Sequence, residues 1–242
     1  MDVRILGACN GLICFGVLVD KKTSIFIWNP TTGEFKEIQH CDFHINSSEP
    51  FIAGFGYDTK TGDYKMVRIE DNKKSDYCEF EVYTFGLQSE KTVHAFYHEF
   101  PNDIALRGIF LNGSLHWINN YPRSLGTSNY IISFDIGNEK LIDVPLPEKS
   151  IVHPEPEDNN PEPYMKVGAL EGFLSLFLVD EKKVRAEVWV MQDYGVRQSW
   201  TKLFTTTQET FTMYAFFCMP MMSLKTGEIL MYICDGFVLC DE

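Results

Sequence analysis

The sequence predicts an all-β fold, a kelch-like, β-propeller-type repeat of antiparallel sheets. Three observations favour it. Apolar stretches are short and rich in β-branched and aromatic residues, which is typical of strands. No window combines a helical apolar period with an N-cap and a terminal glycine, so helix should be scarce. Glycine-opened strand pairs recur at a spacing close to that of four-stranded propeller blades.

The expected strands are distributed along the whole chain. Some of them, such as Ile25–Trp28 and Val188–Met191, are apolar on both alternating faces. A strand of this kind must be covered on both sides, and a sheet stacked between two others in a propeller meets that demand. The stretches are Leu12–Leu18, Ile25–Trp28, Phe80–Phe85, Ile131–Phe134, Phe173–Val179, Val188–Met191 and Met213–Cys218.

Glycines mark the repeat. Gly11, Gly54, Gly113 and Gly172 are predicted to open successive units, with a related turn at Gly236. Between the strands of a unit we expect hairpin turns in which glycine supplies positive φ. These turns are Pro30–Glu34, Asp58–Asp63, Asp135–Glu139 and Ser223–Glu228.

An internal match indicates how the last unit is built. Residues 60–67 align in pattern with 225–232, so the strand Phe80–Tyr83 should correspond to Phe237–Cys240. We therefore expect one propeller-like domain over residues 1–242 that is incomplete at both ends. Phe237, Val238 and Leu239 should then present apolar surface.

The composition is typical of a globular intracellular protein. With 45% hydrophobic and 14% aromatic residues, the 242-residue chain can fill a sizeable core. The sequence shows neither a long apolar run nor a secretory signal, so the cytoplasm, and the nucleus as well, are the expected compartments. Seven cysteines lie mostly inside apolar runs, as expected of reduced, buried thiols.

The charge balance bears on partners. Asp and Glu outnumber Lys and Arg by 34 to 21, giving a net charge of -13. This balance argues against a nucleic-acid or anionic-membrane surface and is compatible with a basic protein partner.

Two polar insertions are expected to project into solvent and supply the candidate contact residues. Residues 153–163 hold four prolines and four acids, which excludes a central strand or a helix. The segment Glu70–Asp76 separates two strands of one unit. The candidate partner-binding residues are Asp71, Lys73, Lys74, Glu155, Glu157, Asp158 and Glu162.

No motif predicts catalytic, cofactor-binding or metal-binding residues. The nucleophile elbow, the zinc-protease helix and the phosphate-binding glycine loop are all missing from the sequence. Histidines at positions 40 and 44, and at 94 and 98, are spaced for a helix but lie in strand or loop sequence. On a strand they would stand about 13 Å apart, too far to share a zinc ion. The tryptophans at 28, 117, 189 and 200 are predicted to be core residues at equivalent places of the repeat.

Several motifs in this order and spacing resemble one known family over nearly the whole chain. They are Leu6–Cys14, Trp28–Phe35, Gly54–Asp58, Asp63–Val67, Leu111–Trp117, Ile132–Asp135, Glu187–Gly195 and Ser199–Lys202. The chain resembles the F-box-associated, kelch-like (type 1) interaction region of plant F-box proteins, the group that includes the S-locus F-box proteins of pollen. It departs from the family at Ser89–Lys91, where a tryptophan usually follows the serine, so the strand there is less well supported.

The resemblance implies a non-catalytic receptor of an SCF-type (cullin-RING) ubiquitin ligase. This region would bind the protein to be ubiquitinated, while an amino-terminal F-box, for which the sequence leaves no room, would contact the adaptor and cullin. A basic secretory ribonuclease of self-incompatibility is the substrate that the S-locus resemblance implies. The alternative is a propeller enzyme or a lectin-like sugar-binding module, which would need convergent carboxylates or stacking aromatics at a central opening.

Overall fold

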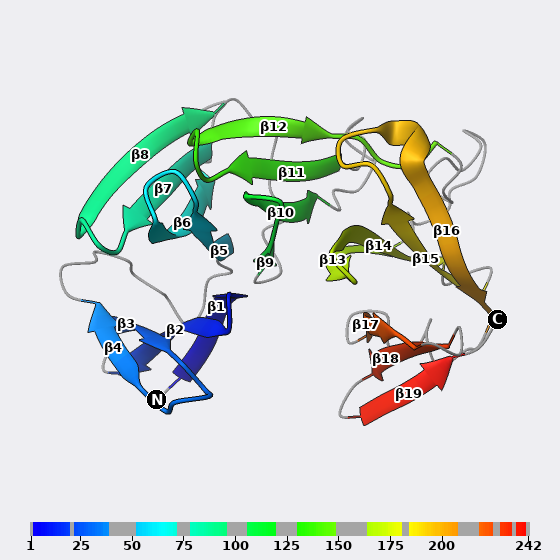
Figure 1. Cartoon of the computed structure of the whole chain (residues 1–242), viewed down its shortest axis with the longest axis horizontal. Coiled ribbons are helices and arrows are strands. Elements are labelled where there is room, and N and C mark those ends of the chain that lie inside the picture. Colours follow the sequence, from blue (N-terminus) through cyan, green and yellow to red (C-terminus); the bar gives the residue numbers. More distant parts are fainter. Residues whose placement is uncertain are drawn as a thin grey trace. The chain divides into compact units, whose positions relative to one another are not determined.

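The computed structural model describes residues 2–19, 22–38, 52–71, 78–95, 106–119, 130–148, 164–180, 184–207, 218–224, 228–233 and 236–240. In this part of the chain the only helical element is one 3-10 turn, Arg197–Ser199, and the remaining regular structure is strand. Figure 1 shows the strands as successive antiparallel sheets. The predicted all-β fold is therefore confirmed. Among the described residues, no helix has the length and apolar character needed to cross a membrane.

Each sheet is a meander in which strands that follow one another in sequence also pair in space. The first sheet has the order β1-β2-β3-β4, the fourth β13-β14-β15-β16 and the fifth β17-β18-β19. In the sequence between them, β5–β8 and β9–β12 are two further meanders that the parallel pairing of β5 with β9 joins into one eight-stranded sheet; we call these meanders the second and third sheets. The strands are β1 (Asp2–Cys9), β2 (Leu12–Val19), β3 (Lys22–Trp28), β4 (Phe35–Ile38), β5 (Ile52–Asp58), β6 (Asp63–Asp71), β7 (Cys78–Thr84), β8 (Ser89–Ala95), β9 (Leu106–Leu111), β10 (Ser114–Asn119), β11 (Tyr130–Asp135), β12 (Lys140–Val144), β13 (Tyr164–Leu170), β14 (Phe173–Asp180), β15 (Arg185–Met191), β16 (Trp200–Thr206), β17 (Cys218–Ser223), β18 (Ile229–Ile233) and β19 (Gly236–Cys240).

The chain forms two compact units, each with its own core. The first comprises Met1–Trp117 with Ser133–Ile142, and the second comprises Ile118–Ile132 with Asp143–Glu242. In the first unit, one core cluster joins the first two sheets through residues such as Leu6, Cys14 and Phe55. In the second unit, the fourth and fifth sheets share a cluster that includes Phe177, Val188 and Met231.

The glycine repeat is present, but its four glycines do not occupy equivalent places in the units. Gly11, Gly113 and Gly172 lie in the turns between the first and second strands of their sheets, all with positive φ. Gly54 instead lies inside β5, and the turn that follows this strand uses Gly62. The sequence pattern does not distinguish glycines in turns from glycines inside strands, because both kinds lie beside apolar strand residues.

The second kind of glycine lets neighbouring first strands approach each other. A Cβ atom on Gly7 of β1 would lie 2.7 Å from the backbone nitrogen of Phe55 in β5. Similarly, Cβ atoms on Gly54 and Gly108 would lie within 3 Å of the side chains of Leu115 and Trp117, respectively. Gly54 is directly opposite Gly108 where β5 and β9 pair. Only a residue without a side chain fits these positions.

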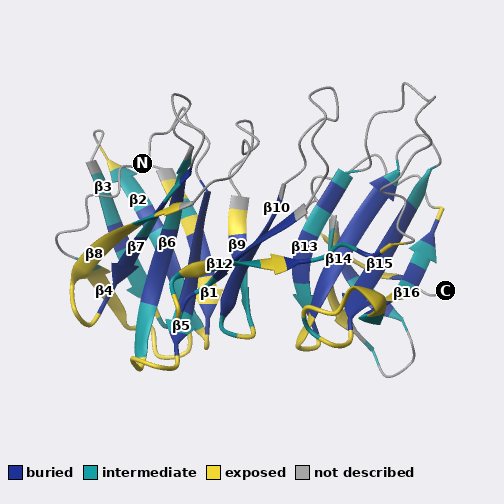
Figure 2. Cartoon of the chain, turned by 90° about the horizontal axis from the view of Figure 1, so that it is seen from above, coloured by how far each residue is buried: buried dark blue, intermediate teal, exposed yellow. Residues whose placement is uncertain are grey.

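Two of the strands predicted to be covered on both faces are covered (Figure 2): Val188–Met191 and Ile131–Phe134 are buried throughout. The same prediction is wrong for Ile25–Trp28, where only Ile25 is buried, because the second sheet packs on one face of the first sheet alone. The prediction for the tryptophans is only partly right, because the four lie on second, third and fourth strands instead of equivalent ones. Trp117, Trp189 and Trp200 are buried, but Trp28 is 37% exposed.

The first sheet has an apolar outer face that is not covered by the second sheet. Its inner face supplies Leu6, Cys14 and Ile25 to the core. Since side chains alternate along a strand, the outer face carries the remaining residues of each strand, including Phe15, Phe26 and Phe35. Phe26 packs on both other rings, with centroid distances of 5.4 Å to Phe15 and 6.3 Å to Phe35. Val3, Ile5, Trp28 and Phe35 on this face are exposed by 37% or more.

The fifth sheet confirms the internal match. Both β6 and β18 are second strands, and both β7 and β19 are third strands. A hydrogen bond from the backbone N–H of Leu224 to the carbonyl of Glu228 closes the turn between β17 and β18. The exposure predicted for Phe237, Val238 and Leu239 is also confirmed, at 64%, 40% and 51%.

The buried cysteines lead to a prediction about reactivity. Cys9 is 5% exposed, and burial raises the pKa of its thiol to about 11. Because the thiolate is the reactive form, iodoacetamide at pH 8 should leave Cys9 unlabelled in the folded chain and label it in urea. Mass spectrometry of the peptide that contains Cys9 measures this. Rapid labelling of Cys9 under native conditions would contradict the burial.

Candidate functional site

The predicted contact residues fall almost entirely outside the described part of the chain. This holds for Lys73, Lys74, Glu155, Glu157, Asp158 and Glu162. The insertion predicted at Glu70–Asp76 begins too early, because Glu70 and Asp71 belong to β6, where Asp71 pairs with Cys78, the first residue of β7. The exposure and contacts predicted for these side chains therefore remain predictions.

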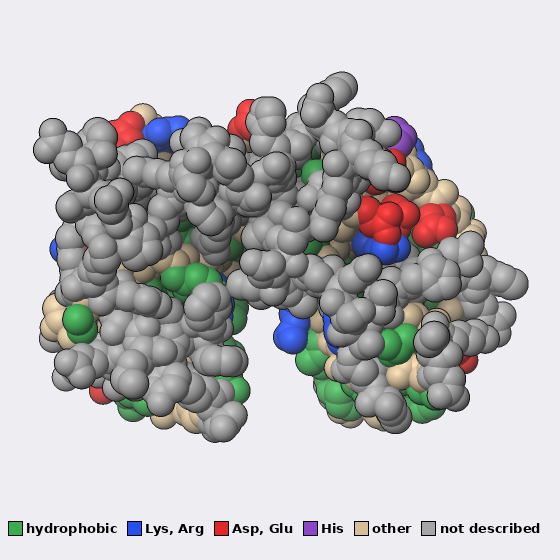
Figure 3. All heavy atoms as spheres, turned by 180° about the vertical axis from the view of Figure 1, so that it is seen from behind, with side chains coloured by type: hydrophobic (Ala, Val, Ile, Leu, Met, Phe, Trp, Pro, Cys, Tyr) green, Lys and Arg blue, Asp and Glu red, His purple; other side chains and the backbone are tan. Residues whose placement is uncertain are grey.

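Charged side chains gather on the second sheet next to the end of β6. Register places Arg68 opposite Glu81, and Glu70 opposite Glu79. The guanidinium of Arg68 pairs with Glu70 and, at 3.3 Å, with Glu81, while His94 lies 3.9 Å from Glu79. Three carboxylates thus surround one guanidinium and one imidazole. The space-filling view shows acidic side chains gathered beside a basic one on this sheet (Figure 3). We call these residues, Arg68, Glu70, Glu79, Glu81 and His94, the acidic edge.

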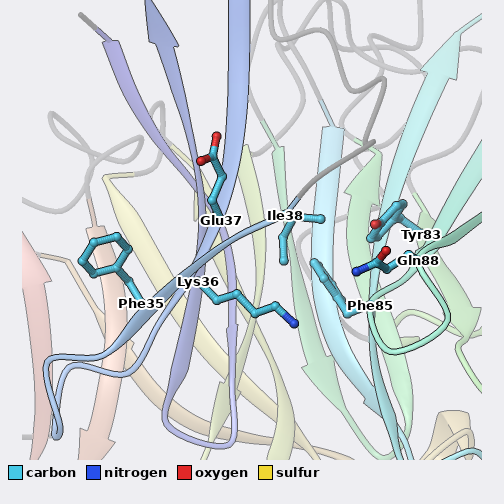
Figure 4. A pocket seen from close by; sticks show the side chains of 7 residues that line it. All are labelled: Phe35, Lys36, Glu37, Ile38, Tyr83, Phe85 and Gln88. Atoms are coloured by element: carbon cyan, nitrogen blue, oxygen red, sulfur yellow. The ribbon is translucent and has the colours of Figure 1, made fainter.

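A cavity of about 490 Å³ lies between β4 of the first sheet and the turn after β7 of the second. It is lined by Phe35, Lys36, Glu37, Ile38, Tyr83, Phe85 and Gln88. Lys36 and Ile38 point toward Tyr83 and Phe85, whereas Phe35 points away from both rings (Figure 4). The volume is within the range of ligand-binding pockets.

The residues that line this cavity combine aromatic rings with few charged groups. Glu37 is the one carboxylate among the lining residues, and it points away from Phe85 (Figure 4). Tyr83 and Phe85 are 1% and 8% exposed, so neither presents the open ring face on which a sugar stacks. The lining is thus mixed, with Ile38, Tyr83 and Phe85 beside the amine of Lys36 and the amide of Gln88.

The cavity and the acidic edge are two parts of one surface. Glu79, Glu81, Tyr83 and Phe85 are alternate residues from β7 into the following turn, so they share one face of the second sheet. Tyr83 and Phe85 belong to the core cluster shared with the first sheet. Each step of two residues covers about 7 Å. Two carboxylates thus continue the row that begins at the aromatic floor of the cavity.

A buried lysine ties together three elements of the first unit. The Lys65 amine lies 2.9 Å from Asp58 and 2.7 Å from Glu139, and donates to the carbonyl of Ile136 at 3.2 Å. Burial alone would raise the pKa values of both carboxyl groups, but the hydrogen bonds and charge of Lys65 outweigh it and hold both values below their usual range. Lys91 of β8 also pairs with Glu139. Both carboxylates therefore stay ionised at neutral pH and serve the fold.

This network predicts a pH dependence of stability. A carboxyl group whose pKa is lower in the folded than in the unfolded chain stabilises the fold above its unfolded pKa, which is about 4 for Asp and Glu. The free energy of unfolding should therefore fall as the pH drops below about 4. Urea denaturation between neutral and acidic pH measures this. The Lys65→Met variant should show a weaker dependence over that range, and an equal dependence would contradict the assignment.

A second buried carboxylate belongs to the second unit. Glu187 of β15 is 2% exposed and pairs with Arg185 and, at 3.3 Å, with Lys202. It also accepts a hydrogen bond of 2.9 Å from the indole of Trp189. Lys202 lies over the Trp189 ring, 5.8 Å from its centroid. A buried charge with this many partners is satisfied, so we assign Glu187 a structural role.

The histidines give no ligand set in the part of the chain that the structure describes. No group of three His, Cys, Asp or Glu residues there is placed to hold a metal ion. His116 is fully buried next to the carbonyl of Ile109, and burial lowers its pKa to about 4, so it stays neutral. The residues His40, Cys41, His44 and His98 lie outside the described ranges.

Comparison with known proteins gives one family. A family profile described as an F-box associated beta propeller domain matches residues 1–238. F-box/kelch-repeat protein At3g23880 of Arabidopsis thaliana is 29% identical over 206 residues, covering 83% of this chain and 52% of that protein. F-box protein CPR1 of the same plant is 28% identical over 225 residues, covering 84% and 52%. The chain thus spans about half the length of the curated relatives it matches.

Solved structures give only a distant likeness. The β-propeller domain of the Trilobed protease from Pyrococcus furiosus covers 98% of this chain with a TM-score of 0.45 and 11% sequence identity. A likeness at this level carries no argument about function.

Proposed function

Because the chain belongs to the F-box associated beta propeller family, we propose that it is the substrate-recognition module of an SCF-type (cullin-RING) ubiquitin ligase. The observation that supports this proposal is the family match over residues 1–238. Relatives named as F-box proteins agree with it. In this role the chain contacts the adaptor and the cullin through an F-box, and acts in the cytoplasm and the nucleus.

The module contributes binding, and a separate enzyme performs the ubiquitin transfer. A receptor raises the effective concentration of its substrate next to the reacting enzyme and fixes its orientation. This role needs a rigid scaffold with a contact surface. In the described part, the β4–β7 cavity and the acidic edge offer such a surface on well-packed strands.

The substrate that we propose is a basic protein. The net charge of -13 and the acidic edge both favour a partner of opposite sign. A secretory ribonuclease of self-incompatibility is one basic protein of this class, implied by the S-locus resemblance alone.

The test couples the chain to an F-box and follows ubiquitin transfer in plant cells. We expect the fusion to co-purify with the adaptor and the cullin, and one basic protein to become ubiquitinated and to accumulate when the proteasome is inhibited. The F-box without this chain is the control. If the same substrates are ubiquitinated in the presence of either protein, the chain does not select them and the proposal fails.

Charge reversal tests the acidic edge. The double variant Glu79→Lys and Glu81→Lys should slow association with the basic substrate and weaken the salt dependence of the rate, because rim charges act mainly on association. Stopped-flow or biolayer measurements at several ionic strengths give these rates. The control is Glu171→Lys, which reverses the charge of one exposed acid in the β13–β14 turn. Its change of charge per residue is the same as in the double variant, and it should leave the association rate nearly unchanged.

A further inference from the structure

We propose that the β4–β7 cavity and the acidic edge, together called the groove, bind an extended segment of the partner protein. An apolar side chain of this segment lies in the cavity, and a lysine or arginine two residues away lies at the acidic edge. This inference rests on the proposed function and names the chemistry that the contact surface would recognise. Three observations carry it: a strand edge with no partner strand among the described residues, aromatic rings at the base of the cavity, and carboxylates at matching spacing.

The first observation is the outer edge of β4. This strand is the last in the order of the first sheet. The N–H of Asn29 bonds to the carbonyl of Glu34, and Lys36 is opposite Ile27. Hydrogen-bonded and non-hydrogen-bonded pairs alternate in an antiparallel ladder, so Phe35 and Glu37 direct their backbone groups away from β3. Those groups can pair with an added extended segment, as in β-augmentation.

The second observation is the direction of the side chains beside that edge. Lys36 and Ile38 face the cavity from β4, and Tyr83 and Phe85 close it from β7 (Figure 4). A segment paired with β4 turns every second side chain toward the same side as Lys36 and Ile38. One of them therefore faces the cavity, where Ile38 and the edges of the Tyr83 and Phe85 rings favour burial of an aliphatic group.

The third observation is the spacing of charge along β7. Glu81 and Glu79 follow Tyr83 on the same face at steps of two residues. An extended segment has the same step, about 7 Å, so the next side chain on the groove side lies level with Glu81. The Glu81 and Glu79 side chains remain 23% and 27% exposed. Arg68 divides its single charge between Glu70 and Glu81, so a cation there finds carboxylates whose charge is offset only in part.

Lys36 makes the groove asymmetric in charge. Its amine is on the Phe85 side of the cavity (Figure 4), whereas the carboxylates lie beyond Tyr83. A cationic ligand residue is favoured at the carboxylate end and disfavoured at the lysine end. The segment should therefore bind in one direction only.

The experiment uses short synthetic peptides and fluorescence polarisation with the 242-residue chain. In one peptide a lysine precedes a leucine by two residues, and in another it follows the leucine by two. In a third, glutamate replaces the lysine. We expect one of the two lysine peptides to bind at least about tenfold more tightly than the glutamate peptide. Equal affinity of all three peptides would overturn the proposal, as would a preference for glutamate.

Variants then locate the site. Glu37→Pro removes an outward N–H from an edge strand, where proline is tolerated, and should abolish peptide binding. Glu37→Ala keeps that N–H and should bind about as well as the wild type. Glu81→Gln should weaken binding about tenfold, and Phe35→Ala, whose side chain points away, should not. Circular dichroism confirms that each variant is folded, and unchanged binding by Glu37→Pro would overturn the proposal.

The F-box fusion separates this inference from the proposed function. If Glu37→Pro leaves ubiquitin transfer to the substrate intact, the receptor role stands and the groove is not its contact site. If Glu37→Pro abolishes peptide binding but no substrate is ubiquitinated in the presence of the fusion, the groove is a peptide-binding site and the proposed receptor role is wrong.

Discussion

Gly7→Val is expected to lower the free energy of unfolding by about 3 kcal/mol, the upper end of the usual cost of overpacking. The Cβ of the new side chain would lie 2.7 Å from the backbone nitrogen of Phe55 and 2.8 Å from its Cβ. Neither atom can rotate away, so the first strands of two sheets must separate. The separation disturbs the core that Leu6 and Phe55 share. Urea denaturation followed by circular dichroism measures the loss.

Gly236→Val is the matched control. Gly236 is also a strand glycine, but a Cβ atom there meets nothing within 4 Å. Its substitution should change the free energy of unfolding by about 0.5 kcal/mol or less. Equal losses in the two variants would mean that glycine flexibility, and not close approach of the strands, explains Gly7.

Lys65→Met is expected to cost about 3 kcal/mol, the lower end of the range for breaking a buried ion pair. The lysine side chain is 5% exposed and its partner Asp58 is 1% exposed. Removing the amine leaves Asp58 as a buried charge with no cation beside it. Glu139 loses less, because it is 18% exposed and keeps its pairing with Lys91. Thermal and urea denaturation at neutral pH measure the cost.

The control for Lys65 is Lys91→Ala. Lys91 also pairs with Glu139, but its side chain is 64% exposed. A solvent-exposed ion pair contributes about 1 kcal/mol or less. A comparable loss in both variants would show that the effect comes from charge balance and not from burial.

The fold was predictable because it rests on local patterns. The continuous apolar sequence of Val188–Met191 indicates a buried strand, and the glycine at position 33 indicates the turn in which it has positive φ. β8 forms from Ser89 onward although the family's usual tryptophan is missing there. Its pairing with β7 along seven positions compensates for the missing ring.

The candidate site was not predictable, because it depends on register between strands distant in sequence. Lys36 of β4 and Tyr83 of β7 line one cavity although they are far apart in the sequence, so their common role depends on β4 lying next to Tyr83. The structural pair Lys65 and Glu139 was hidden for the same reason, because the two residues are 74 positions apart. A weak signal did exist. Glu79, Glu81 and Tyr83 alternate along β7 and Phe85 continues the alternation into the turn, so their common face could have been read from the sequence.

Strand order also bears on how the chain folds. Within each sheet, every pairing joins strands that are consecutive in sequence, so hairpins can form after short loop closures and do so quickly. The parallel pairing of β5 with β9 is different, because β6, β7 and β8 intervene. The chain between β5 and β9 comprises the rest of the second sheet. The entropic cost of bringing β5 and β9 together is therefore small only after that sheet has become compact. We therefore expect β9 to pair after the second sheet has formed, and Trp117, which packs beside Gly54 and Gly108, to report that late step in its fluorescence.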